Sequence, residues 1–119
     1  MYSATASNIK TNGNGKMDKM GLKDINSPAD LKLVSMEDLP AIAQEIRELL
    51  ISTCSANGGH IGANLGVVEL TMALHYTFNT PKDKVIFDTS HQAYTHKILT
   101  GGRDKFPTIC KYPGGMTRF

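Results

Sequence analysis

The stretch KVIFDTSHQAYTHKILTGG, residues 84–102, decides the fold class of this chain of 119 residues. Residues 84–88 have the length and the β-branched content of a buried strand. The polar residues 89–92 then form a loop, and a short helix is predicted over residues 93–100, ended by Gly101-Gly102. A strand followed directly by a helix is typical of α/β proteins. The sequence therefore predicts an α/β fold, mostly helical, with one or a few parallel strands.

Two longer helices are predicted upstream from apolar residues at helical spacing. The first begins near Ser35, an N-cap residue with Asp38 in the capping-box position, and runs to about Cys54. The second covers residues 67–78, is apolar on most sides and should be largely buried. Residues 55–66 between them contain four glycines in nine positions and are expected to form a loop that bends sharply.

The two ends of the chain differ from this middle part. Residues 1–21 are rich in Ser, Thr, Asn, Gly and Lys and are predicted to be a disordered tail, because they carry little apolar surface. Residues 22–119 are then expected to form one structural unit. From Arg103 onward the sequence is basic and irregular, with no recognisable closing element.

Composition excludes several classes of protein. The net charge of +2 is spread along the chain, which argues against nucleic-acid binding. No apolar run approaches the roughly 18 residues that a membrane span requires. Cys54 and Cys110 suggest no disulfide framework and are interpreted as free thiols. With no secretory signal, a cytoplasmic location is expected, and a plastid origin stays open.

The first group of candidate functional residues follows the predicted strand. Helix N-termini at the carboxyl ends of strands favour phosphate groups, and His91 there can donate a hydrogen bond or move a proton near neutral pH. The alternative, which the local sequence alone favours, is that Ser90 caps the helix and His91 is a solvated loop residue.

The second candidate is the Gly58-Gly59-His60 sequence. Glycines beside a histidine allow the backbone to approach a ligand closely and leave the imidazole accessible. The alternative is an ordinary connection between two helices that carries an exposed histidine. Because apolar helices bracket it, the loop should at least be well positioned.

Other polar residues carry weaker signals. His75 lies inside the apolar second helix and is predicted to be a hydrogen-bonded core residue. His91 and His96 are five residues apart, and no metal-binding spacing occurs, so a zinc site is not expected. Glu69 and Asp88 are isolated carboxylates, and they are interpreted as a charge on a helix surface and a cap at a strand end, respectively. Four cations could contact an anionic substrate, although a solvated basic face is the commoner explanation for them. They are Lys97, Arg103, Lys105 and Lys111.

Three stretches together resemble one enzyme family. Residues 55–71, SANGGHIGANLGVVELT, and residues 73–84, ALHYTFNTPKDK, are similar to the segment of 1-deoxy-D-xylulose-5-phosphate synthases that contains Gly-Gly-His. Residues 90–101, SHQAYTHKILTG, resemble the family signature HQAYxHKILTG, and residues 25–32 resemble its lead-in. A long ordered series of matches is more specific than any single motif.

The resemblance implies a partial transketolase-like domain that binds thiamine diphosphate together with Mg²⁺. It also implies the family reaction, in which pyruvate loses carbon dioxide and its two-carbon unit joins glyceraldehyde 3-phosphate, for isoprenoid, thiamine and pyridoxal synthesis. By matched position, His60 would be catalytic and assist proton transfer. His91, with Ser90 and Gly59, would bind the cofactor, and the parent enzyme would be a homodimer.

The chain departs from the family pattern at several points. Ser90 stands where the family has glycine, and Gly102-Arg103 replaces its double arginine. No GHSSTS-like segment, Gly-Asp-Gly motif or cofactor-activating glutamate is present, so the metal ligands are not expected within this chain. The isolated chain is therefore predicted to be inactive. The alternatives are one subunit of a split enzyme, or a truncated, non-catalytic binding module.

Overall fold

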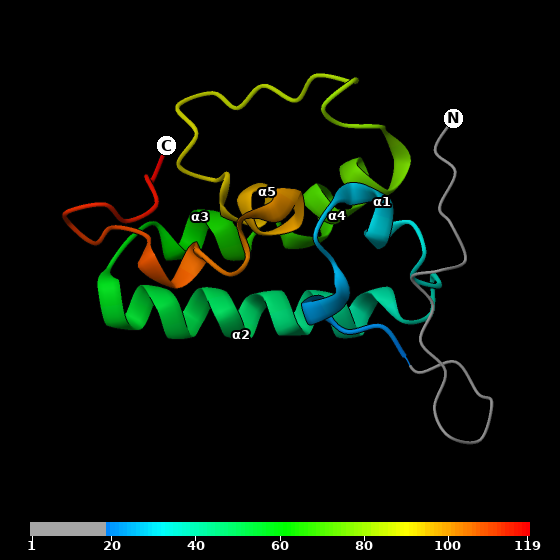
Figure 1. The fold of residues 1–119 in the computed structure, drawn as a ribbon, viewed down its shortest axis with the longest axis horizontal. Coiled ribbons are helices and arrows are strands. Elements are labelled where there is room, and N and C mark those ends of the chain that lie inside the picture. The colour runs from blue at the N-terminus through cyan, green and yellow to red at the C-terminus, as the bar shows by residue number, and fades with distance from the viewer. Residues whose placement is uncertain (1–18) are drawn as a thin grey trace.

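The computed structural model describes residues 19–119, and the chain forms helices in two layers (Figure 1). The long helix α2, Leu39–Asn57, makes one layer by itself. The second layer lies across it. It contains the shorter helices α1 (Pro28–Leu31), α3 (Ile61–Leu65), α4 (Val68–Thr77) and α5 (Tyr94–Lys97), the π-type turn η3 (Ile98–Gly102), and the 3-10 turns η2 (Leu22–Asp24) and η4 (Phe106–Thr108).

Helix α2 is amphipathic, and its apolar face forms one side of the core. Ile42, Ile46 and Leu50 lie on that face and are fully buried. They pack against Tyr94, Phe106 and other apolar side chains of the second layer, and this burial is the main stabilising contribution to the fold. Helix α2 therefore acts as the base on which the other elements are held.

The predicted start of α2 at Ser35 was wrong by several residues. Asp38 is the N-cap, and Pro40 lies in the first turn, where its missing N–H breaks no hydrogen bond. The Ser35 hydroxyl donates to the Asp38 carboxylate and accepts no hydrogen bond from a helix N–H. Together with Lys19, 3.3 Å away, this hydrogen bond lowers the pKa of Asp38.

The glycine-rich stretch contains less loop than expected. Helix α2 continues to Asn57 and α3 starts at Ile61, so only Gly58, Gly59 and His60 connect them. The second predicted helix exists as α4, but its burial was overestimated, because Leu70 is 60% exposed.

The predicted strand over residues 84–88 was wrong for this structure. Within residues 19–119 no strand forms, and the segment passes over the second layer as an arch between α4 and α5 (Figure 1). A strand exists only when another strand satisfies its backbone groups, and no described segment pairs with this one. The predicted helix after it is confirmed in shorter form, as α5, and the left-handed Gly101, at φ 101°, ends the helical region.

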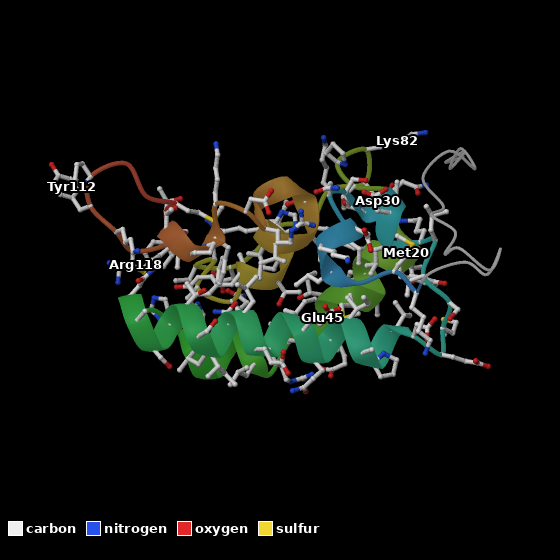
Figure 2. All side chains as sticks on the ribbon, turned by 60° about the horizontal axis from the view of Figure 1, so that its bottom comes forward. Met20, Asp30, Glu45, Lys82, Tyr112 and Arg118 are labelled. Carbon is white, nitrogen blue, oxygen red and sulfur yellow. The ribbon has the colours of Figure 1, made fainter. Side chains whose placement is uncertain are left out.

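Arg103 ties the segment after η3 to the start of the described chain. Its guanidinium donates to the carbonyls of Leu22 and Ile25, both 2.7 Å away, and to the side chain of Asn26. The segment after it ends in an open loop, at whose tip Tyr112 projects away from the helices (Figure 2).

Two other expectations can be compared with the structure. Cys54 and Cys110 are free thiols, as predicted. Among residues 19–119, none of the helices combines the length and the apolar character that a membrane crossing requires. The predicted tail falls mostly outside the described residues, which begin at Lys19.

Candidate functional site

The structure brings the two predicted site histidines together. The rings of His60 and His91 meet edge to face, with centroids 5.7 Å apart and an interplanar angle of 73°. His60 is the residue before α3, and His91 lies in the turn before α5. The two residues are 31 positions apart in the sequence, so their contact is a product of the tertiary fold.

A buried asparagine holds the two histidine-bearing segments together. The side-chain amide of Asn64 donates to the carbonyls of His60 and His91, and its oxygen accepts from the N–H of Tyr94. Asn64 has no solvent exposure, so these three hydrogen bonds satisfy a polar side chain that would otherwise be destabilising. The sequence motifs did not single out this residue. A signal was present, because asparagine is a poor helix former in the interior of α3.

Tyr94 and Gly59 determine the backbone position of His60. The N–H of His60 donates to the Tyr94 hydroxyl at 3.2 Å, and burial raises the pKa of that hydroxyl. Gly59 has φ 127°, and a Cβ built on it would lie 3.0 Å from the Tyr94 oxygen and 3.5 Å from Cys54 Sγ. Only glycine fits this conformation and this space without strain. The second glycine of the Gly-Gly-His sequence is therefore required for steric reasons.

Ser90 lies beside His91 in a strained backbone conformation. Thr89 and Ser90 have φ values of 64° and 70°, in the left-handed region that favours glycine. The Ser90 hydroxyl donates to the carbonyl of Phe87 at 3.3 Å. The N-cap of α5 is Ala93, and no side chain caps that helix, so the interpretation of Ser90 as a helix cap is wrong.

The histidine pair has hydrogen-bonding capacity that the described chain does not use. The buried atoms His60 Nε2, His91 Nδ1 and Gln92 Oε1 have no hydrogen-bond partner within the described residues. Buried polar atoms are nearly always paired in folded proteins, so unpaired ones at one location indicate a missing ligand or water. Imidazole N–H groups can donate to phosphate oxygens, so the two histidine nitrogens, unlike the acceptor Gln92 Oε1, fit the diphosphate cofactor that the resemblance implies.

A cavity of about 570 Å³ opens beside the Gly-Gly-His sequence. Gly58 and Gly59 form one wall, and the C-terminal loop, with Lys111 and Arg118, forms the other. The Phe119 ring lies 5.8 Å from the His60 ring. The cavity thus combines a close-approach backbone with two cations, which suits an anionic ligand. Within residues 19–119, no three His, Cys, Asp or Glu side chains gather to hold a metal ion.

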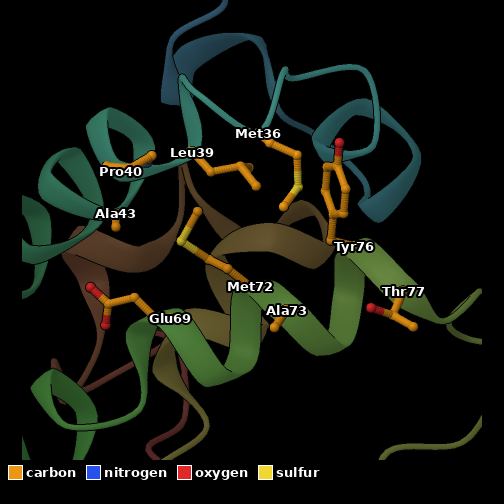
Figure 3. Close-up of a pocket in the computed structure, with 9 residues that line it drawn as sticks. All are labelled: Met36, Leu39, Pro40, Ala43, Glu69, Met72, Ala73, Tyr76 and Thr77. Carbon is orange, nitrogen blue, oxygen red and sulfur yellow. The ribbon is translucent and has the colours of Figure 1, made fainter.

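A second cavity, of about 440 Å³, lies between the start of α2 and α4, and contains none of the predicted site residues (Figure 3). Met36, Leu39, Met72 and Tyr76 make its lining largely apolar. The Glu69 carboxylate at its edge is an ion-pair partner of Arg47, 2.5 Å away, which lowers the pKa of Glu69. This cavity lacks the cationic and N–H groups that a diphosphate needs.

His75 has the structural role that the sequence predicts. It is fully buried, and its ring bonds the Thr80 hydroxyl and His96 Nδ1, each 2.9 Å away. Burial lowers the pKa of His75 to about 4, with a smaller contribution from His96. The Lys32 ammonium donates to the carbonyls of His75 and Phe78. The stacking of His96 on His75, with centroids 5.0 Å apart, was not predicted.

Two of the cations considered as substrate contacts are instead used within the fold. Arg103 binds the carbonyls of Leu22 and Ile25 near the start of the described chain. Lys97 donates to the carbonyls of Thr117 and Phe119, at 2.7 and 3.2 Å, and so holds the last residues of the chain against α5. Of the four, only Lys111 lines the cavity beside Gly59.

Comparison with known proteins agrees with the resemblance seen in the motifs. Residues 22–119 match a protein family described as 1-deoxy-D-xylulose-5-phosphate synthase. A synthase of this name from Anaeromyxobacter dehalogenans is 57% identical over 98 residues, which are 82% of this chain and 15% of that protein. Another from Halothermothrix orenii is 59% identical over 90 residues, 76% of this chain and 14% of that protein. The chain therefore spans about one seventh of the length of these relatives, and it belongs to the 1-deoxy-D-xylulose-5-phosphate synthase family.

Proposed function

We propose that this chain supplies the histidine pair of a 1-deoxy-D-xylulose-5-phosphate synthase. The reaction would join the two-carbon unit of pyruvate to glyceraldehyde 3-phosphate with release of carbon dioxide, as part of isoprenoid, thiamine and pyridoxal precursor synthesis. The observation that carries the proposal is the contact of His60 with His91, each with a buried ring nitrogen that has no hydrogen-bond partner among residues 19–119. The domain would be a part of a transketolase-like unit, and the complete enzyme a homodimer.

Each residue near the pair has a specific proposed task. His91 donates a hydrogen bond to a diphosphate oxygen of thiamine diphosphate, and the turn at Ser90 directs it there. Gly59 allows the backbone to approach the cofactor, and the cations Lys111 and Arg118 balance its charge. His60, held by the Tyr94 hydroxyl, moves a proton to or from the substrate. The cofactor, when bound, supplies the electron sink for decarboxylation.

The metal belongs elsewhere in this proposal. Mg²⁺ would be held by residues outside this chain, since no cluster of ligands exists among residues 19–119. Purified chain of 119 residues is therefore expected to show no turnover of pyruvate and glyceraldehyde 3-phosphate. Measurable turnover by this chain would contradict the assignment of the metal and the activating carboxylate to other segments. Recovery of activity on adding a second chain with those motifs would identify a split enzyme.

The test of the proposal is a chimera. Residues 22–119 replace the matching segment of the Anaeromyxobacter dehalogenans relative, and synthase activity is measured at saturating Mg²⁺. We expect the chimera to be active. His60→Ala should lower kcat by about 10²-fold to 10⁴-fold and leave cofactor affinity nearly unchanged. His91→Ala should weaken thiamine diphosphate binding by roughly tenfold to a hundredfold, the value of a hydrogen bond to a charged group.

The control is Lys82→Ala, because Lys82 is exposed and points away from the helices (Figure 2). That variant should retain full activity. A folded but inactive chimera, or an active one that tolerates both histidine substitutions, would contradict the proposed roles. A non-catalytic binding module would also show no heat of binding for thiamine diphosphate in calorimetry of the chimera.

A further inference from the structure

The two cysteines of the sequence, Cys54 and Cys110, converge on the Tyr94 hydroxyl. Cys54 is 8% exposed and belongs to the same buried cluster as Tyr94, and Cys110 packs against that cluster. A Cβ built on Gly59 would lie 3.5 Å from Cys54 Sγ and 3.0 Å from the Tyr94 oxygen. Burial raises the pKa of the Tyr94 hydroxyl, and the thiols of Cys110 and Cys54 raise it further. The two sulfur atoms are therefore close enough to act on the same hydroxyl.

Buried contacts hold the two cysteine-bearing segments against each other. Cys54 lies in the last turn of α2, and Cys110 directly follows Ile109, which has no solvent exposure. The side-chain amide of Asn57, at the end of α2, donates to the carbonyls of Pro107 and Ile109, 2.8 and 3.0 Å away. Figure 1 shows the segment around η4 lying on the C-terminal end of α2. The approach of the two thiols thus depends on the packed core.

The two thiols differ in access. Cys110 is half-buried and lines the cavity beside Gly59, whereas Cys54 is buried behind it and is not part of the cavity lining. A reagent that enters the cavity therefore meets Cys110 first. Lys111, which lines the same cavity, favours a reagent that carries carboxylates. An accessible thiol with a second thiol behind it is the usual arrangement of a reversible redox pair.

We propose that Cys54 and Cys110 form a redox site, in which a small disulfide such as oxidised glutathione converts the two thiols into one intramolecular disulfide. First, the Cys110 thiolate attacks the small disulfide, so that one glutathione leaves and the other stays bonded to Cys110 Sγ. The Cys54 thiolate then attacks Cys110 Sγ, and the second glutathione leaves. Two protein thiols are oxidised and one small disulfide is reduced to two thiols, which take up the two protons that the cysteines lose.

The second step should depend on pH. Burial raises the pKa of Cys54, with a smaller contribution from Cys110, so Cys54 is mostly protonated at pH 7 and attacks faster as the pH rises. The new bond would lie beside the Tyr94 hydroxyl, which accepts from the N–H of His60 at 3.2 Å. Oxidation should therefore also shift the ring signals of His60. The inference rests on the two thiols and does not depend on the coenzyme chemistry proposed above.

The test uses the complete 119-residue chain, reduced and then incubated with oxidised glutathione in the absence of air. Free thiols are blocked by alkylation, and the products are identified by mass spectrometry. The wild-type chain should pass through a glutathione adduct on Cys110 and end as the intramolecular disulfide. Because this bond closes a long loop of the unfolded chain, the melting temperature should rise by roughly 10 °C. Dithiothreitol should reverse both changes.

Two single variants separate the steps. Cys54→Ser should stop at a stable adduct on Cys110. Cys110→Ser should react with glutathione about tenfold more slowly than the wild-type chain, since the remaining thiol is buried. Circular dichroism checks that each variant keeps its helices. A wild-type chain that ends with separate adducts on both cysteines overturns the proposal.

The matched control moves the buried thiol by one position, with Ser55→Cys in the Cys54→Ser background. Residue 55 is exposed on α2, so this chain should form glutathione adducts but no intramolecular disulfide. If the control forms the intramolecular disulfide as fast as the wild-type chain, the proximity of Cys54 to Cys110 in the fold is not required, and the proposal fails.

Discussion

The side-chain amide of Asn64 donates a hydrogen bond to the main-chain carbonyl of His91, 2.8 Å away. Because the same amide also donates to the carbonyl of His60, one buried side chain sets the spacing of the two histidine-bearing segments. The position of the histidine pair therefore depends on a residue that presents no atom to solvent.

Asn64→Ala should separate the two segments. The change leaves the N–H of Tyr94 and two carbonyls without their partner, and we expect a loss of about 2–4 kcal/mol in the free energy of unfolding. Urea denaturation measures this loss, and the ring proton shifts of His60 and His91 report the change in their contact.

Asn57→Ala is the control for that variant. Asn57 also donates two hydrogen bonds, to the carbonyls of Pro107 and Ile109, but lies outside the histidine contact. It should lower stability by about 1–2 kcal/mol and leave the histidine shifts unchanged. Equal effects of the two variants on those shifts would show that Asn64 has no special positioning role.

Gly59→Ala should destabilise the fold by about 1–3 kcal/mol. The new methyl group would require φ 127° and would approach the Tyr94 hydroxyl at 3.0 Å. Gly62→Ala provides the comparison, because Gly62 lies in α3 with an ordinary φ, and a Cβ added there would meet nothing within 4 Å. That variant should be neutral or stabilising by up to about 1 kcal/mol. Chemical denaturation of both proteins tests the difference, and a tolerated Gly59→Ala would remove the steric explanation.

How far the sequence predicted this site depends on the residue. His60, His91 and Gly59 could be named because their types and the family motif agree, and the short distance between the two rings is consistent with that choice. Asn64 and Tyr94 could not, because their importance comes from hydrogen bonds across about 30 positions of sequence. Local patterns do not report such contacts.

The fold, too, could be predicted from the sequence only where it depends on local residues. The apolar spacing of α2 depends only on its own residues, so the helix was predicted, although its start moved from Ser35 to Leu39. Residues 84–88 were predicted to be a buried strand from their length and β-branched content, yet no strand forms within residues 19–119. A strand forms only when two segments pair, and the sequence of residues 84–88 describes only one of those segments.

Ser90→Gly should stabilise the chain by up to about 1 kcal/mol. A left-handed conformation costs a non-glycine residue roughly 1–2 kcal/mol, and the larger backbone entropy of glycine in the unfolded chain offsets part of the gain. Ser55→Gly, in the exposed part of α2, should instead destabilise by about 0.5 kcal/mol. Thermal denaturation of the pair provides the measurement. Destabilisation by Ser90→Gly would mean that its hydrogen bond to Phe87 outweighs the backbone strain.

The buried His75 should make the stability of this protein depend on pH. Burial lowers its pKa from 6.5 to about 4, so the unfolded chain binds a proton at this residue more readily than the folded one. The stabilising contribution is therefore complete above pH 6.5 and is lost as the pH falls toward 4. By linkage, about 2 kcal/mol should disappear between pH 7 and pH 5.

Urea denaturation of the wild-type chain and of His75→Gln at pH 7 and pH 5 separates the buried His75–His96 pair from the titrating groups that do not contact it. Glutamine lacks a titrating proton, so its variant begins less stable but should lose about 2 kcal/mol less over the same interval. The carboxylates Asp38 and Glu69, whose pKa values are lowered, stay ionised throughout this interval and contribute little to the difference. If both proteins lose the same amount, His75 must be protonated in the folded state, and the Thr80–His75–His96 chain of hydrogen bonds must then carry a charge.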